Sequence, residues 1–176
     1  MSFAALYARC PGIAEVSRVL SSVLFVVGSV LFLPAMSEGA SLVGVWLYLL
    51  GSLGFLSAAL LDEWRAGGVG RQSLSCGLFV FGSLASAPTA VTLLSPYPAL
   101  GLFIAGCLGL LARLGRLTWH TLCPSVGCTL FIAGCGLLPL GQDTAGVGLF
   151  IAGSACFLLD ALSAAARPVL WGTPAT

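Results

Sequence analysis

Asp160 is the residue of this sequence with the clearest chemical potential, because it is an acid within a long apolar stretch. An ionisable residue in such a place is costly, and by default it marks a functional site with an oppositely charged partner. Arg113 is the candidate partner. It lies seven residues after Gly106, as Asp160 lies seven after Gly153, in two copies of a repeat described below. We predict an Arg113–Asp160 ion pair that clasps two helices.

Small residues precede both Arg113 and Asp160 at intervals of four positions. This pattern predicts which faces of the two helices meet. Gly101, Ala105 and Gly109 precede Arg113, and Gly148, Ala152 and Cys156 precede Asp160. Two such stripes are expected to pack face to face, because small residues let helix backbones approach. The alternative is that each charge reaches the headgroups separately. A proton relay would need several acids or histidines, so a structural clasp is favoured.

Other reactive side chains form no catalytic or metal-binding set. His120 is the single histidine, and Cys123, three residues on, has only chance helical spacing from it. A nucleophile needs a base held within hydrogen-bond reach. The cysteines have no Cys-x-x-Cys spacing and are interpreted as small packing residues. We therefore expect no catalytic residue, no metal and no cofactor, and the chain is not expected to be an enzyme. The cysteines are at positions 10, 76, 107, 123, 128, 135 and 156.

The composition indicates whether this chain lies in water or in lipid. Of its 176 residues, 59% are hydrophobic and 7% are charged, with seven basic and six acidic side chains. An ordinary soluble domain carries about 25% charged residues. So little charge excludes a soluble globular domain and a disordered chain, and the absence of a basic surplus excludes a nucleic-acid binder. The mean hydropathy of +1.08 favours the lipid bilayer.

Charged residues divide the chain into apolar stretches long enough to cross a membrane. A spanning helix needs roughly 20 mostly apolar residues. We expect helices near 18–35, 42–61, 73–93, 99–115, 121–139 and 145–165. The predicted fold is an all-α polytopic membrane bundle, with six transmembrane helices arranged as three repeated hairpins. The divisions are an interfacial segment 1–16, hairpins 17–65, 73–116 and 121–166, and a tail 167–176.

A short repeat occurs once in each predicted helix: Leu, then Phe or Tyr, two apolar residues, Gly, then Ser or Cys. Its glycines are Gly28, Gly51, Gly82, Gly106, Gly134 and Gly153. Helices in lipid associate through small residues that admit close backbone approach. We therefore interpret each glycine as a notch that an aromatic residue of a neighbouring helix can fill. In each predicted hairpin the first helix is expected to end near a proline, at Pro34, Pro88 or Pro139.

Basic residues predict the orientation. The chain has no lysine, and in the six-helix arrangement every arginine falls on one side, with Glu38 and Asp143 in loops on the other. Basic loops stay on the cytoplasmic side. Both termini are therefore expected on the cytoplasmic, matrix or stromal side of a plasma membrane or an organelle inner membrane. The arginines are Arg9, Arg18, Arg65, Arg71, Arg113, Arg116 and Arg167.

Residues Ser17–Arg65 resemble the YrhK-like family of small membrane proteins. The resemblance is carried by Val23–Pro34, which reads VLFVVGSVLFLP, and by Gly44–Ser52, which reads GVWLYLLGS. The family implies a two-helix hairpin with Gly-Ser in each helix and a proline that ends the first. Its molecular function is uncharacterised, so the resemblance implies architecture and membrane residence. The hairpins 77–116 and 129–165 fit the same pattern more loosely.

Three classes of function compete. The leading hypothesis is a non-catalytic scaffold, assembly factor or accessory subunit that meets protein partners or copies of itself in the bilayer. The alternative is a small solute or ion transporter or channel, since transporters often contain repeats with broken helices at the binding site. The prolines here lie at span ends, which counts against that alternative. A membrane enzyme acting on lipid or quinone would need catalytic groups that the sequence does not supply.

Overall fold

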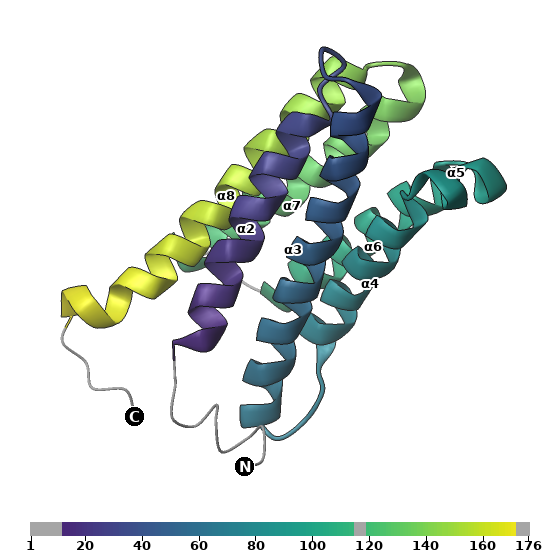
Figure 1. Cartoon of the computed structure of the whole chain (residues 1–176). Coiled ribbons are helices and arrows are strands. Elements are labelled where there is room, and N and C mark those ends of the chain that lie inside the picture. The colour runs from purple at the N-terminus through teal and green to yellow at the C-terminus, as the bar shows by residue number, and fades with distance from the viewer. Residues whose placement is uncertain (1–11, 115–118, 172–176) are drawn as a thin grey trace.

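The computed structural model describes residues 12–114 and 119–171 of the chain, and this part is all α-helical with no strand (Figure 1). Short turns join most of the helices. The elements are α2 (Ile13–Leu31), α3 (Glu38–Arg65), α4 (Arg71–Ala85), α5 (Pro88–Leu94), α6 (Tyr97–Leu114), α7 (Trp119–Leu137), the 3₁₀ turn η1 (Leu138–Leu140) and α8 (Asp143–Trp171).

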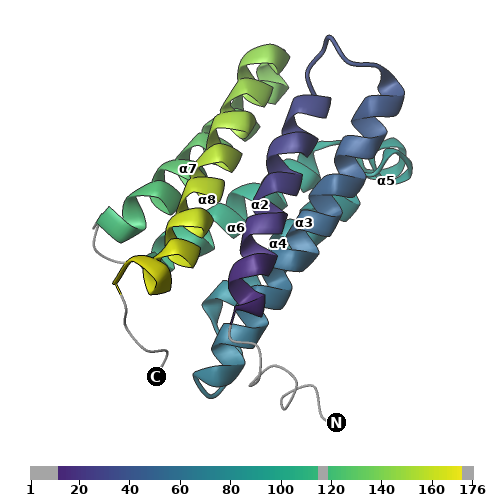
Figure 2. The same cartoon turned by 60° about the vertical axis from the view of Figure 1, so that its left-hand side comes forward.

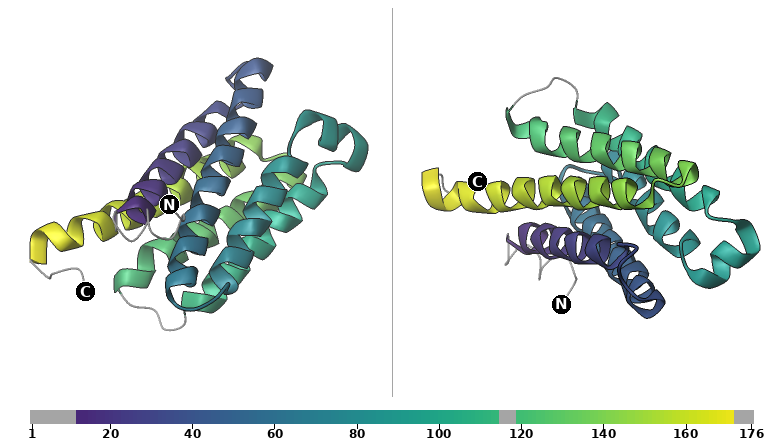
Figure 3. Two further views of the ribbon diagram at one scale, coloured as in Figure 1. Left: turned by 60° about the horizontal axis from the view of Figure 1, so that its bottom comes forward. Right: turned by 90° about the horizontal axis from the view of Figure 1, so that it is seen from above.

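The helices pack as three pairs that close into a ring. The most extensive contacts join α2 with α3, α7 with α8, and α4 with α6. We call these the first, third and second helix pair, in chain order. Each pair also contacts both others, through α3 with α4, α2 with α8, and α6 with α7. Figures 2 and 3 show the first and third pairs side by side, with the second pair covering their other side.

Prolines mark the ends of the first helix in each pair, as the sequence predicts. The helix α2 ends at Leu31, shortly before Pro34, and α4 ends at Ala85, before Pro88. In the third pair, Pro139 lies in η1, which follows α7 directly. Proline has no backbone N–H to donate and disfavours helix in the residue before it.

Three helices extend four or more residues beyond the predicted limits. The helix α2 begins at Ile13, so residues 13–16 are not part of a separate interfacial segment. α3 covers 28 residues rather than 42–61, and α8 continues through residues 167–171, which were expected in the tail. Hydropathy marks only the apolar part of a helix, whereas backbone hydrogen bonds continue into the polar interface. At the start of α3, the Ser37 side chain accepts a hydrogen bond from the Ala40 N–H at 3.2 Å.

The prediction of one long helix over 73–93 was wrong. The structure has α4 with 15 residues, a break at Ser86–Ala87, and α5 with seven. Pro88 holds Ala87 in extended backbone at φ −62° and ψ 141°. Five helical segments of the described chain are long and apolar enough to cross a membrane: Ile13–Leu31, Glu38–Arg65, Tyr97–Leu114, Thr121–Leu140 and Asp143–Ala166. α4 is shorter, because 15 residues rise about 22 Å against a hydrocarbon core of about 30 Å.

Aromatic rings fill the middle of the bundle. Phe25 and Tyr48 meet within the first pair with ring centroids 4.5 Å apart, and Phe131 stacks on Phe150 at 5.2 Å within the third. Contacts such as Phe25–Phe131, at 6.2 Å, join different pairs. The buried rings of this core are the aromatic residues of the repeat, namely Phe25, Tyr48, Phe79, Phe103, Phe131 and Phe150. The repeat thus builds the core of the fold.

Candidate functional site

Each repeat glycine lies against the repeat aromatic ring of the other helix in its pair. A Cβ added at Gly28 would come within 2.7 Å of the Tyr48 ring, and one at Gly51 within 2.9 Å of the Phe25 ring. No side chain fits at such distances unless the ring moves. The same reciprocal contact joins Gly82 with Phe103, Gly106 with Phe79, Gly134 with Phe150, and Gly153 with Phe131. These glycines therefore set how closely the two helices of a pair approach.

The serine or cysteine that follows each repeat glycine lies between pairs. The hydroxyls of Ser52 and Ser83 hydrogen-bond at 3.0 Å and join α3 to α4. The hydroxyls of Ser29 and Ser154 do so at 3.2 Å and join α2 to α8. Where α6 meets α7, cysteines take this place in the core. All six repeat positions are at most 1% exposed: Ser29, Ser52, Ser83, Cys107, Cys135 and Ser154.

A pocket of about 320 Å³ lies at one end of the ring of pairs and contains the charged side chains that the sequence singled out. All three pairs contribute to it from equivalent repeat positions. Arg18, Gln72 and Pro124 each precede a repeat glycine by ten residues. Phe55, Leu110 and Phe157 each follow one by four residues. The pocket is thus lined by corresponding positions of three similar units that carry different side chains.

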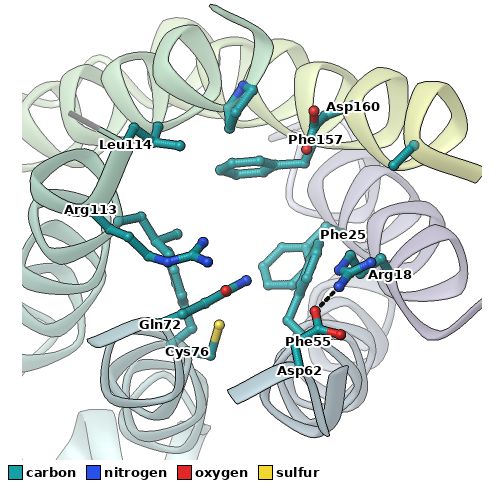
Figure 4. A pocket seen from close by; sticks show the side chains of 14 residues that line it. Arg18, Phe25, Phe55, Asp62, Gln72, Cys76, Arg113, Leu114, Phe157 and Asp160 are labelled. Atoms are coloured by element: carbon teal, nitrogen blue, oxygen red, sulfur yellow. Dashed lines mark hydrogen bonds and ion pairs between the residues drawn. The ribbon is translucent and has the colours of Figure 1, made fainter. Parts of the chain in front are cut away.

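The first and second pairs each contribute an arginine to the pocket, and the two arginines differ in their salt bridges. On the first pair, Arg18 forms a salt bridge with Asp62 of α3 and a longer one, at 3.8 Å, with Glu15. On the second pair, Arg113 and Gln72 point into the pocket from α6 and α4 (Figure 4). The salt bridges among the described residues are the two made by Arg18, and Arg113 takes part in neither.

The prediction that two small-residue stripes pack face to face was wrong. α6 packs on α4 and α7, whereas α8 packs on α7 and α2. A Cβ added at Gly101 or Gly148 would meet nothing within 4 Å, and Gly109 faces Ser75 of α4. The helix α7 stands between the two stripes, because α8 pairs with α7 and α6 contacts α7 from the neighbouring pair.

Arg113 and Asp160 nevertheless line the same pocket. They come from different walls, with Asp160 on α8 beside Phe157 and Arg113 across the pocket (Figure 4). The salt bridges of the described residues do not include one between them. The structure therefore brings the two residues to one site without joining them as the predicted ion pair.

Several residues discussed from the sequence lie outside the described part. They are Arg9, Cys10 and Arg116, together with the side chains of His120 and Arg167. Within the described part, Cys76, Cys107, Cys123, Cys128, Cys135 and Cys156 are free thiols. Those residues contain no group of three or more His, Cys, Asp or Glu side chains that could hold a metal ion.

Sequence reasoning missed Gln72 and the acid that positions it. The Glu63 carboxylate accepts hydrogen bonds from the backbone N–H groups of Gly70 at 2.7 Å, Gln72 at 2.9 Å and Ser73 at 3.2 Å, and from the Ser73 hydroxyl. These bonds satisfy the free N–H groups at the start of α4. They fix the α3–α4 turn, and with it the backbone that carries Gln72. Counting back from the repeat glycines would have aligned Gln72 with Arg18.

Gly153→Ala is expected to destabilise the protein, because the added methyl would lie 2.6 Å from the Phe131 ring and 3.0 Å from the Gly127 oxygen. Overpacking of this kind costs about 1–3 kcal/mol. Gly148→Ala is the control in the same helix, since an added Cβ there meets nothing within 4 Å. It should be neutral or gain up to about 1 kcal/mol from helix propensity. Unfolding in mixed detergent, followed by circular dichroism, measures both. Equal effects would contradict the notch interpretation.

The hydroxyls of Ser52 and Ser83 are expected to couple the first pair to the second. In a double-mutant cycle with Ser52→Ala and Ser83→Ala, we expect a coupling free energy of about 0.6 kcal/mol, typical of hydrogen bonds between membrane helices. The same unfolding measurement gives this value. As a control, Ser57→Ala removes a hydroxyl that donates to the Leu53 carbonyl of its own helix, at 2.8 Å. Combined with Ser83→Ala it should show no coupling, and similar coupling in both cycles would refute the contact's role.

A family comparison agrees with the geometry of the first pair. Residues 13–65, which contain α2 and α3, match the family model described as YrhK-like protein. Comparisons with curated proteins and with solved structures found no match. The match includes both repeats of the first pair, the reciprocal Gly28–Tyr48 and Gly51–Phe25 contacts, and Pro34 between the helices. Residues 13–65 are therefore similar to YrhK-like proteins, which confirms the resemblance seen in the sequence.

Proposed function

We propose that this protein is a six-span integral membrane bundle that acts as a non-catalytic scaffold or accessory subunit of a membrane complex. The observation that carries the proposal is the aromatic core. Phe25 and Tyr48 of the first pair meet Phe131 of the third pair in the middle of the ring, with 3%, 4% and 1% of their surface exposed. In the described part of the chain, these packed rings give the bundle a firm shape and occupy its axis at the level of the repeat.

Apolar side chains on the outer surface support a lipid environment. Trp46 and Leu50 of α3 are each 55% exposed, and Phe81 of α4 is 62% exposed. In water such surfaces would favour aggregation, whereas lipid tails accommodate them. Together with five membrane-length helices and the YrhK-like match, these surfaces are consistent with an integral membrane protein.

The helix α4 is the sixth crossing in this proposal. Its repeat residues Phe79, Gly82 and Ser83 are buried and contact α6 and α3, as their counterparts do in the longer helices. These contacts support a crossing in which the repeat of α4 lies at the same depth as the repeats of the other helices. We infer that α5 covers the remaining depth at the far end, where it turns aside from α4 (Figure 1).

The distribution of charge supports the proposed orientation. Arg65 ends α3, Arg71 begins α4, and Arg113 lies in the last turn of α6. Glu38 and Asp143 begin α3 and α8 at the opposite ends of those hairpins. By the positive-inside rule, the arginine end and both termini face the cytoplasm, matrix or stroma. Each pair of helices then forms one hairpin across the membrane.

The alternative is a small solute or ion transporter or channel. Transporters place their sites near the midplane between broken helices. The helix α7 has Pro124 in its interior, and this proline lines the pocket near the arginine end rather than lying at the level of the repeat. A transporter would have to use this pocket as an entrance and move the aromatic core at every cycle. The packed core therefore favours the scaffold.

Liposome flux measurements separate the two functions. Wild-type protein in liposomes should show no proton, potassium or small-solute flux above that of protein-free liposomes, because the rings block the axis. Leu110→Trp, which narrows the pocket, provides a matched variant. Flux in the wild type that falls in the Leu110→Trp protein would overturn the scaffold proposal in favour of transport.

Purification from the native membrane in mild detergent tests the scaffold directly. We expect a stoichiometric companion chain, measured by quantitative mass spectrometry, that occupies one outer face. Leu50→Ala and Phe81→Ala alter exposed side chains on different helices, α3 and α4, without touching the core. One of these substitutions should reduce recovery of the companion more than the other. Recovery of a lone monomer in every case would contradict the proposal.

A further inference from the structure

The pocket at the arginine end combines the inward-pointing Arg113 cation with apolar walls. Arg113 and Gln72 supply polar groups, while Phe25, Phe55 and Phe157 supply apolar surface. We propose that this pocket binds the head of an anionic amphiphile, with a phosphate or carboxylate group on Arg113 and Gln72. The first apolar carbons of the ligand then lie against the three phenylalanine rings. This inference rests on the proposed membrane orientation but not on the scaffold role, since a scaffold, a transporter or an enzyme could each hold such a ligand.

Salt bridges distinguish Arg113 from the other arginine of the pocket. The other arginine of the pocket, Arg18, is engaged by Asp62 and Glu15. The side chain of Arg113 extends from the last turn of α6 into the open space, and its guanidinium faces Gln72 (Figure 4). A guanidinium presents a planar fork of N–H donors that matches a phosphate or a carboxylate. An anion is therefore the ligand group that this wall fits.

Gln72 supplies a second donor on a fixed backbone. Its N–H is held by Glu63 at 2.9 Å, so the first turn of α4 has a defined position beside the pocket. From there the side-chain amide points toward the same space as Arg113 (Figure 4). An amide N–H₂ group donates to one anion oxygen while the guanidinium binds the others. The two residues form a pair of donors from neighbouring helices of the second pair.

The acids of the pocket leave this position open to an anion. Asp62 is engaged by Arg18 on the first pair. Asp160 lies on the α8 wall beside Phe157, across the pocket from Arg113 (Figure 4). A ligand on Arg113 and Gln72 therefore approaches cationic and neutral donors on its own wall, with Phe157 and Asp160 on the wall opposite.

Size and position define the class of ligand. About 320 Å³ is near the lower limit for small-molecule pockets, which enclose roughly 300–1,000 Å³, so it suits a headgroup and a few methylenes. In the orientation proposed above, the arginine end lies at the headgroup level of a leaflet that is rich in anionic lipid. The same chemistry would also admit a free phosphate or a short carboxylate from the aqueous side.

Binding of short-chain probes to the purified full chain in detergent tests the proposal. The probes are dihexanoylphosphatidylglycerol, dihexanoylphosphatidylcholine, hexanoate and inorganic phosphate, each titrated by calorimetry. We expect phosphatidylglycerol to bind at least about tenfold more tightly than phosphatidylcholine, because only the former carries net negative charge. If hexanoate or inorganic phosphate competes at equal affinity, the site serves free anions. If neither competes, it serves a lipid headgroup, and both results support an anion site.

Arg113→Gln is expected to weaken phosphatidylglycerol binding about tenfold or more, because it removes the charge of the fork. Arg71→Gln is the matched control, since Arg71 lies at the same end of the molecule but does not line the pocket. It should leave the affinity within about twofold, since exposed charges are screened. Circular dichroism and elution volume establish that each variant is folded.

Leu110→Trp provides a second variant that keeps every charge and reduces the free volume. It should weaken phosphatidylglycerol strongly and inorganic phosphate little, because the apolar part of the ligand loses its space. Equal affinity for phosphatidylcholine and phosphatidylglycerol would overturn the proposal. Unchanged phosphatidylglycerol affinity in both Arg113→Gln and Leu110→Trp would do so as well, and the second variant decides the matter where the first does not fold.

Discussion

Close approach of helix backbones at glycine is the contact on which the rest of this structure depends. Burial of leucine gives helices little reason to associate in lipid, because the tails are equally apolar. Dispersion contacts must hold the helices together instead, and these contacts require that the atoms of the two helices lie close to one another. A Cβ added at Gly134 would lie 2.9 Å from the backbone oxygen of Gly146, so the backbones of α7 and α8 touch there. All three pairs contain such a crossing at the level of the repeat.

The order of residues in the repeat explains how one short motif makes the contacts within each helix pair and also the contacts between pairs. The aromatic residue lies three positions before the glycine, so both are on the same helix face. In an antiparallel pair the partner presents these two residues in reverse order, and each ring meets a glycine. The next residue, Ser or Cys, is rotated by about 100° around the helix and faces the neighbouring pair instead. Adjacent residues such as Gly51 and Ser52 thus serve contacts within a pair and between pairs.

Much of this arrangement is predictable from sequence, and the failures have identifiable causes. Helix positions follow from hydropathy, and turns follow from Pro34, Pro88 and Pro139, because both are local properties. Partner choice is not local. The stripe that contains Gly101 and Gly109 defines a helix face, but any small-residue face can pack against it, and the ring closure placed α7 beside α6. Pro88 could either end a single helix or separate two helices, and here it separates α4 from α5. Averaged hydropathy does not distinguish these two cases, because the residues on both sides are apolar.

The pocket arises where the three units stop resembling one another. At the level of the repeat, all three pairs place rings on the axis, and the rings fill it. Further toward the arginine end, identical units would bring three identical side chains together. Three arginines in such a place would repel, and three leucines would close the space. The chain instead has Arg18, Gln72 and Pro124 at corresponding positions, and Arg113 and Asp160 at another such pair. Packing alone favours uniform repeats, so different side chains at corresponding positions around one cavity are a feature that a binding site requires and a purely structural bundle does not.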